Sequence, residues 1–336
     1  MMRRLWRAVG FAATLVVMSC SGSGDNPGKR TIRVNGRPYL TNMPLLIADA
    51  EGYFADEGLQ IEYVELPDHT SQAIPALDNG QLDVIAGIVS VGLFNAVARG
   101  AAIRIVADKG QIDSRSCDYA GIIGRRGAFP PGTVSAGDVR GRKFSITFVG
   151  SNGFIFSRFL EQLKVKESEI ETVGLSAATE AQALETGAID GLITSEPWVS
   201  RLVGAGHRLI APARLLVARQ QQAVLLYGPT LASQDRDAGT RFMRAYLRGV
   251  RRFSEGHTPA NSKFVSEQTG IDSVKMKGVC WPAFDPNGAV DTGALAEFQQ
   301  WAFGRGLLDR IVTPVEYLDS DFATRAAASL TSGQRE

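Results

Sequence analysis

Cysteine and histidine are scarce in this sequence, with three of each among its 336 residues. The cysteines (Cys20, Cys117 and Cys280) form no CxxC pair, and the histidines are also widely separated in the sequence. Zinc sites normally gather such ligands at short, regular spacing. The chain also contains no G-x-S-x-G nucleophile elbow. We therefore expect no metal site, no cofactor and no catalytic residue.

An excess of charge of one sign is lacking as well, because 36 Lys and Arg balance 35 Asp and Glu for a net charge of +1. The basic residues are scattered, unlike the basic stripe of a nucleic-acid-binding surface, so nucleic acid is not an expected partner. The apolar run of residues 8–18 is too short for a membrane helix, which needs about 20 residues.

The N-terminus instead has the order of an export signal, in which a basic segment precedes a short apolar one. Residues 17–20 (VMSC) resemble a bacterial lipobox, with Met18 in place of the usual small residue. We expect residues 1–19 to be a lipoprotein signal peptide and Cys20 to be lipidated after cleavage. Ordinary signal cleavage nearby, with Cys20 as a bystander, is the alternative. The Gly- and Ser-rich residues 20–30 would form a flexible tether.

Export also bears on the other two cysteines. If Cys20 holds lipid, Cys117 and Cys280 remain as an even pair in an oxidising compartment. A disulfide and two separate buried thiols both fit the sequence, because spacing does not show whether the Cα atoms approach. In either case we expect a protein of the periplasm or cell surface, anchored to the membrane as a lipoprotein.

One phrase occurs twice in the chain. Residues 76–83 (ALDNGQLD) and 183–190 (ALETGAID) share the pattern A-L-x-x-G-x-(L/I)-D. Each glycine suits the left-handed position that ends a helix. Each copy is followed by a short apolar run that is typical of a buried strand. The repeat predicts two similar α/β lobes, and a cleft between lobes is a common place for a small ligand.

The remaining pattern alternates strands with helices, which indicates parallel-type α/β lobes. The expected strands are 31–34, 60–66, 83–88, 103–106, 119–123, 143–147, 171–173, 190–194 and 223–227. The expected helices are 44–51, one that ends at 79–80, 93–99, 154–163, 180–186, 237–253, 261–269 and 292–305.

Several stretches resemble the solute-binding proteins of ABC importers, in the subgroup that binds nitrate, sulfonates, taurine and thiamine-pyrimidine precursors. The stretches are residues 44–59 (PLLIADAEGYFADEGL), both copies of the repeat, Glu196-Pro197-Trp198 and residues 285–308. The resemblance implies an α/β fold of the type II periplasmic-binding-protein kind, with two lobes, two hinge strands and a ligand cleft. Lobe 1 would comprise 30–120 and 226–336, lobe 2 would comprise 121–225, and the hinge strands would be 119–123 and 223–227.

The same resemblance implies a function. The protein would capture a small organic molecule and deliver it to the permease subunits of an ABC importer, as a monomer and without catalysis. Two alternatives stay open, a ligand-sensing receptor that is not coupled to transport and an enzyme similar to the pyrimidine-precursor synthases of this fold. Those synthases depend on a cysteine cluster that this sequence lacks.

The candidate ligand contacts lie in loops at the carboxyl ends of expected strands, where α/β sheets bind ligands. They are Asn42, Met43, Asp68, His69, Ser90, Ser151, Asn152, Gly153, Phe154, Thr194, Glu196 and Trp198. Helix N-termini in these loops favour polar groups, and Phe154 and Trp198 would supply flat walls for a ring. Because the loops contain no Arg or Lys, we expect a pyrimidine or flavin-like precursor ahead of an organosulfonate.

Overall fold

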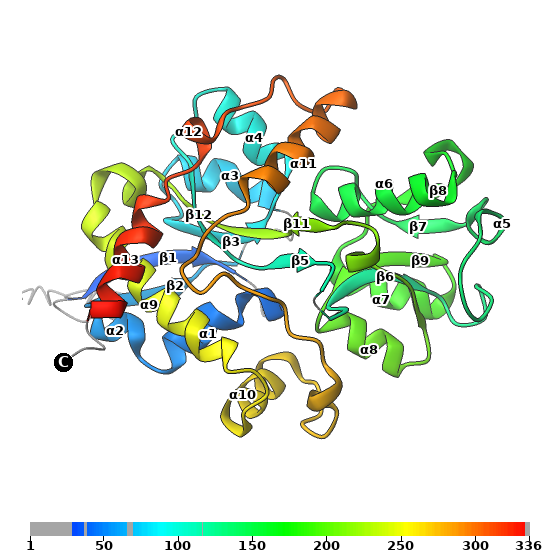
Figure 1. Ribbon diagram of the computed structural model, residues 1–336, viewed down its shortest axis with the longest axis horizontal. Coiled ribbons are helices and arrows are strands. Elements are labelled where there is room, and N and C mark those ends of the chain that lie inside the picture. Colours follow the sequence, from blue (N-terminus) through cyan, green and yellow to red (C-terminus); the bar gives the residue numbers. More distant parts are fainter. Residues whose placement is uncertain (1–28, 37–38, 66–69, 116, 333–336) are drawn as a thin grey trace, which may run out of the picture.

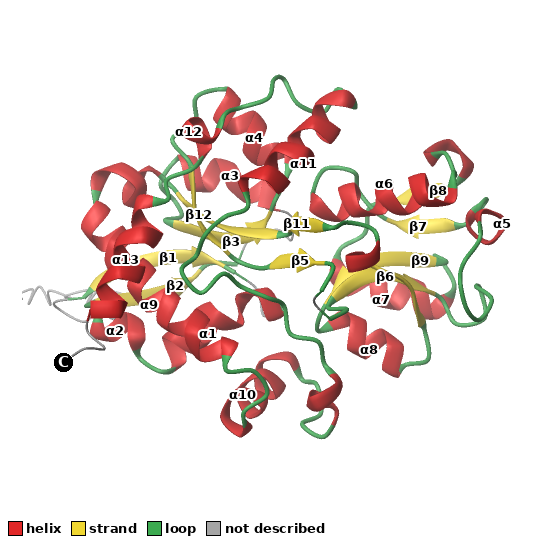
Figure 2. Ribbon diagram, in the orientation of Figure 1, coloured by secondary structure: helices red, strands yellow, loops and turns green. Residues whose placement is uncertain are grey.

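The computed structural model describes residues 29–36, 39–65, 70–115 and 117–332. Two five-stranded sheets lie side by side, each covered by helices on both faces (Figure 1, Figure 2). We call the unit around the first sheet lobe 1 and the unit around the second sheet lobe 2. The predicted signal peptide, Cys20, most of the predicted tether, Asp68 and His69 lie outside the described residues.

The two sheets have the same strand plan. The first has the order β2-β1-β3-β12-β4, and the second, counted from its corresponding edge, has the order β8-β7-β9-β6-β10. In each sheet the first three strands are parallel and the fourth runs antiparallel to both of its neighbours. The bounds in sheet 1 are β1 (Arg30–Asn35), β2 (Leu59–Tyr63), β3 (Val84–Ile88), β4 (Arg104–Asp108) and β12 (Ala223–Tyr227). Those in sheet 2 are β6 (Ala120–Gly124), β7 (Lys143–Ser145), β8 (Glu171–Val173), β9 (Gly191–Ser195) and β10 (Arg208–Pro212).

The helices follow the same division. Those of lobe 1 are α1 (Met43–Ala50), α2 (Tyr53–Asp56), α3 (Thr70–Asp78), α4 (Val91–Ala98), α9 (Arg236–Ser254), α10 (Pro259–Thr269), α11 (Thr292–Gly304), α12 (Pro314–Tyr317) and α13 (Asp321–Ser332). Those of lobe 2 are α5 (Ala136–Val139), α6 (Ser151–Leu163), α7 (Ala177–Thr186) and α8 (Trp198–Gly204). Within the described ranges, no helix is both long and apolar enough to cross a bilayer.

The repeated phrase occupies equivalent places in the two lobes. Gly80 follows α3 with φ of +68°, and Gly187 follows α7 with φ of +79°. Both torsions are left-handed, where a residue with a Cβ is strained, so glycine is required at these positions. The chain then turns directly into β3 in lobe 1 and β9 in lobe 2. The two similar α/β lobes that the repeat predicts are therefore present.

The aspartate that closes each copy ties neighbouring strands together. The Asp83 carboxylate accepts a 2.8 Å hydrogen bond from the N–H of Arg33 on β1, and it is paired with the Arg33 guanidinium at 3.0 Å. The Asp190 carboxylate likewise accepts from the N–H of Lys143 on β7 at 3.2 Å and pairs with Arg125 at 2.9 Å. The aspartate at the end of each copy thus has a structural role, because it links neighbouring strands.

The chain crosses between the lobes through two short strands that the sequence pattern did not reveal. These are β5 (Gln111–Asp113) and β11 (Arg219–Gln221), which pair antiparallel between the two large sheets (Figure 1). The expected hinge strands 119–123 and 223–227 instead lie inside the sheets as β6 and β12, so the expected lobe boundary at residue 225 falls within β12. Because β5 and β11 are only three residues long and largely polar, they carry little strand signal.

Lobe 1 and lobe 2 also meet away from this crossing. α11 packs against α6, as Figure 1 shows at the upper edge of the molecule. The Phe154 ring on α6 lies 6.2 Å from Phe298 and 5.6 Å from Trp301 between ring centroids. The buried core is therefore continuous between the lobes on this side.

Helix α9 is packed closely against α1, and one glycine makes that approach possible. A Cβ added at Gly249 would overlap the carbonyl oxygen of Pro44 and lie 3.0 Å from the Cβ of Ala48. We predict that Gly249→Ala lowers the free energy of unfolding by about 1–3 kcal/mol, because the two helices must separate. Denaturant unfolding measures the change.

The matched control is Gly304→Ala at the end of α11, where an added Cβ meets no atom within 4 Å. This change is expected to leave stability unchanged or to raise it by up to about 1 kcal/mol, because alanine loses less backbone entropy in a helix. Equal destabilisation by the two substitutions would contradict the close contact between α1 and α9.

Candidate functional site

A cavity of about 170 Å³ lies between the two lobes. Its walls are formed at the carboxyl ends of strands from both sheets, as the rule for α/β sheets predicts. The polar lining residues are Asn35, Tyr39, Thr41, Asn42, Ser90 and Lys109 from lobe 1, Ser145, Thr147, Asn152, Glu180, Thr194 and Ser195 from lobe 2, and Gln222 beside β11. Since about 150 Å³ holds a benzene ring, the space suits a small organic molecule.

Four of the residues proposed from sequence are brought together in this lining: Asn42, Ser90, Asn152 and Thr194. Ser90 caps α4, since its Oγ accepts a 3.3 Å hydrogen bond from the Leu93 N–H. Asn152 accepts a 2.7 Å hydrogen bond from the side chain of Gln222. Contact of these four residues with a ligand stays a prediction.

Three other candidates lie in apolar or surface packing and are not among the described lining residues. Met43 is fully buried in the apolar cluster beneath α1. Phe154 points into the core between α6 and α11, because the first turn of α6 turns that face away from the cleft. Trp198 begins α8 and lies against the guanidinium of Arg201, 5.0 Å from its ring centroid. The expected ring walls are therefore not provided by Phe154 or Trp198.

Ser151 and Gly153 belong to the first turn of α6, which begins three residues earlier than expected. The Ser151 N–H donates to the carbonyl of Val89 at 2.9 Å, and its Oγ donates to the carbonyl of Gln222 at 3.1 Å. Gly153 is needed for packing, since an added Cβ would lie 2.6 Å from the Cα of Phe148. Both residues thus hold the cavity wall rather than face the cavity.

The helix starts of the two lobes are joined directly at the cavity. The Val91 N–H donates to the carbonyl of Val149 at 2.8 Å, next to the bond from Ser151 to Val89. These two bonds form an antiparallel bridge between Ser90 and Gly150, both of which line the cavity. The first N–H groups of α4 and α6 are therefore used to connect the lobes.

Glu196 makes a second connection, on another side of the site. Its backbone carbonyl accepts from the N–H of Leu40 in lobe 1 at 3.3 Å. Its buried carboxylate accepts from Ser200 Oγ at 2.6 Å and from the Ser200 N–H at 3.0 Å. Burial raises the pKa of Glu196, and these hydrogen bonds oppose the rise. Glu196 thus holds lobe 2 against lobe 1 and is not among the described lining residues.

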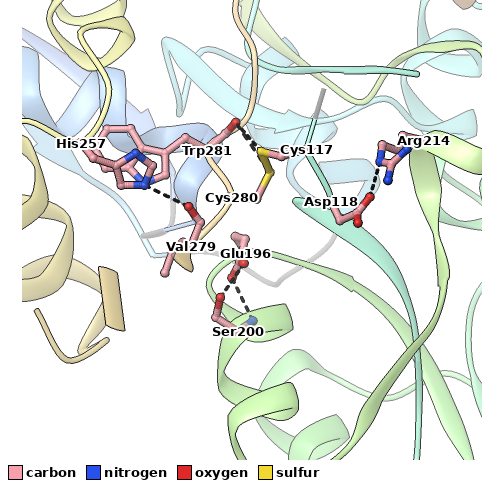
Figure 3. The surroundings of a disulfide bond; sticks show 9 residues. All are labelled: Cys117, Asp118, Glu196, Ser200, Arg214, His257, Val279, Cys280 and Trp281. Carbon is pink, nitrogen blue, oxygen red and sulfur yellow. Dashed lines mark hydrogen bonds and ion pairs between the residues drawn. A yellow bond between two sulfur atoms is a disulfide. The ribbon is translucent and has the colours of Figure 1, made fainter. Parts of the chain in front are cut away.

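Cys280 is joined to Cys117 by a disulfide, with the Cα atoms 5.7 Å apart. Cys117 lies between β5 and β6, and Cys280 lies in the segment that leads to α11. Figure 3 shows the Glu196 carboxyl group between this bond and Ser200. The disulfide therefore links the segment before α11 to the chain that enters β6.

Sequence reasoning missed Lys109, which is 2% exposed and lines the cavity. Its ammonium donates to Asn42 Oδ1 at 2.8 Å and Thr41 Oγ1 at 3.1 Å. Burial lowers the pKa of Lys109 to about 7. The residue directly follows β4, so the strand-end rule applied to that fourth strand would have found it. The loops selected from sequence contain no cation, whereas Lys109, which lies outside them, lines the cavity.

Two α/β lobes of equal strand plan, a double crossing and a cavity between the lobes define the periplasmic-binding-protein class of fold. The chain matches the family model described as NMT1/THI5 like over residues 40–255. That range is more than half of the chain, so this protein belongs to the NMT1/THI5-like family, and the resemblance inferred from its sequence is confirmed. A comparison with curated proteins found no match.

Solved structures share the fold at low sequence identity. A ligand-binding component of an ABC-type import system from Staphylococcus aureus is 14% identical, with a TM-score of 0.73 over 89% of this chain and 99% of that one. The alkanesulfonate-binding protein SsuA from Xanthomonas axonopodis pv. citri, bound to MOPS, is 16% identical, with a TM-score of 0.68 over 85% and 96%. The desulfurization enzyme DSZB is also 16% identical, with a TM-score of 0.66 over 90% and 100%. Binding proteins and an enzyme thus share this fold.

The disulfide closes a loop with a sequence separation of 163 residues. We predict that the double variant Cys117→Ser/Cys280→Ser lowers the free energy of unfolding by about 2–5 kcal/mol, because the unfolded chain regains entropy. Denaturant unfolding with and without reductant measures this. Reductant should destabilise the wild-type protein and leave the double variant unchanged, and an equal response of both would contradict the bond.

Proposed function

We propose that this protein is an extracytoplasmic solute-binding protein that captures a small organic molecule and delivers it to the permease subunits of an ABC importer. The observation that carries the proposal is the cavity lined from both lobes by hydrogen-bonding side chains. The Oε1 atom of Gln222, at the wall of this cavity, is buried and has no hydrogen-bond partner in the described part of the chain. An N–H or O–H of a solute would satisfy it.

The residues that line the cavity best fit a protein that binds its solute without catalysing a reaction. The described lining residues include no histidine or cysteine, and no cluster of potential metal ligands occurs among the described residues. We propose that the binder acts as a monomer and encloses its solute between the lobes. Opening would occur by rotation about β5 and β11, with the bridges at Ser90–Gly150 and Leu40–Glu196 separating. Lobe 1 would then end near β5 and resume near β12.

The size of the cavity bears on the ligands expected from sequence. A pyrimidine ring fits a space of about 170 Å³. The preference for a neutral ring over an organosulfonate rested on loops without a cation. Because Lys109 lies in the cavity, that reason no longer applies, and both ligand classes have to be tested.

The first test is native mass spectrometry of the purified protein. A small molecule of defined mass, lost on denaturation, is the expected result. With that molecule in hand, Asn152→Ala is predicted to weaken its binding roughly tenfold, because a hydrogen bond at the cavity wall is lost. Trp198→Ala serves as the control and should bind normally, since Trp198 packs on Arg201. Weaker binding by Trp198→Ala alone would contradict the proposed site.

Membrane attachment is proposed through lipid on Cys20, as the lipobox-like residues 17–20 favour. We predict that Cys20→Ser moves the protein from the membrane fraction to the soluble extracytoplasmic fraction, because the acyl chains that anchor it are lost. Fractionation and intact-mass measurement test this. A variant that stays in the membrane fraction with unchanged mass would contradict lipidation at Cys20.

A further inference from the structure

The cavity contains one charged group that the proposed function leaves unexplained. The Lys109 ammonium is almost fully buried, and its two hydrogen-bond acceptors, Asn42 Oδ1 and Thr41 Oγ1, are neutral. No carboxylate oxygen lies within ion-pair distance of it among the residues that the structure describes. Buried charges in proteins are normally paired, because an ammonium loses its hydration on burial.

The neighbouring carboxylate does not serve as the partner. Asp108 precedes Lys109 in the chain, but its two oxygens accept from the N–H of Gly110 at 2.9 Å, the N–H of Asp285 at 2.7 Å and the side chain of Gln221 at 2.7 Å. These donors hold the Asp108 carboxylate on the crossing strands. Lys109 is directed instead toward Thr41 and Asn42, which line the cavity with it.

We propose that Lys109 binds the negatively charged group of the solute, so that the ligand of this site is a small organic oxyanion. Carboxylates, sulfonates and phosphate esters share the required chemistry, namely an anionic oxygen that accepts from an ammonium. Asn42 and Thr41 orient the ammonium, and Lys109 gains its missing counter-charge when the solute enters. This inference rests on the proposed function and gives the ligand class of the same site.

Two alternative roles for Lys109 make different predictions. As a structural link between β4 and the turn before α1, it would matter for folding and not for the charge of the ligand. As a donor to a neutral pyrimidine, it would bind charged and uncharged ligands of one shape equally well. Only the proposed role requires discrimination between an anion and its neutral isostere.

The test uses pairs of probes that differ in charge and little in shape. Methanesulfonate is compared with methanesulfonamide, and acetate with acetamide, at millimolar concentration by the shift in unfolding temperature. The wild-type protein should be stabilised by at least one anion and by neither amide. Lys109→Met should lose the response, whereas Lys263→Met, at an exposed lysine of α10, should keep it. A sodium chloride series at equal ionic strength removes general salt effects.

A second measurement needs no variant that alters the cavity. Since burial lowers the pKa of Lys109 to about 7, the amine is neutral above that pH and must take up a proton to hold an anion. Affinity of the wild-type protein for the stabilising anion should therefore fall as pH rises above about 7, by up to roughly tenfold per unit. Proton uptake during binding is measured by calorimetry in buffers of different ionisation enthalpy.

Other titratable groups near the site are Asp108 on the same strand, Tyr39 before α1 and Glu180 on α7. All three remain in Lys109→Met, so a loss of anion binding in this variant is due to Lys109. If Lys109→Met does not fold, the comparison of each anion with its neutral amide on the wild-type protein still decides whether the site binds an anion.

Equal stabilisation by anion and amide, or no stabilisation by any anion, would overturn the inference. The proposed function stands apart from these results. A co-purified neutral molecule in native mass spectrometry would uphold solute capture and refute the anion, whereas no bound molecule together with no response to any probe would count against both.

Discussion

The double crossing of the chain between its sheets is the constraint on which the site depends. Because β5 and β11 pair antiparallel between the lobes, the carboxyl ends of the two sets of parallel strands are brought to one cavity. The crossing also places the fourth strand of each sheet, since β6 follows β5 and β12 follows β11. The loops at Ser90 and Gly150, which are about 60 residues apart in sequence, thereby share one wall.

The contacts around the cavity divide into two kinds. Backbone bonds at Ser90–Gly150 and Leu40–Glu196 join the lobes without regard to side-chain identity. Within this frame the side chains of Asn42, Asn152 and Lys109 provide the chemistry. The backbone bonds explain why the first turns of α4 and α6, which the sequence suggests as ligand-binding turns, connect the lobes instead. The side chains then determine which solute binds.

The lobes also share an apolar core, and this core limits how they can rotate when a solute binds. Phe154 of lobe 2 packs against Phe298 and Trp301 of α11, so buried apolar area resists separation on that side. The backbone hydrogen bond between Leu40 and Glu196 is a smaller, polar contact. The proposed opening would therefore separate the polar contacts while α6 and α11 stay packed.

Local signals predict the α/β class, the paired lobes and the bounds of many elements, because hydrophobic period and helix-ending glycines depend only on neighbouring residues. Strands 171–173 and 223–227 match β8 and β12 residue for residue, and Gly80 and Gly187 end their helices as expected.

Other features depend on how distant segments pack together. Strand partners come from such segments, so local patterns do not predict the pairing of β5 with β11 and do not show that 119–123 and 223–227 lie inside the sheets. The direction of a side chain depends on what packs beside its helix, so Phe154 lies in the core and Trp198 packs against Arg201. The position of Lys109 after an expected strand makes it a candidate from sequence, but its burial beside Asn42 depends on the fold, since no local pattern marks a lysine as buried.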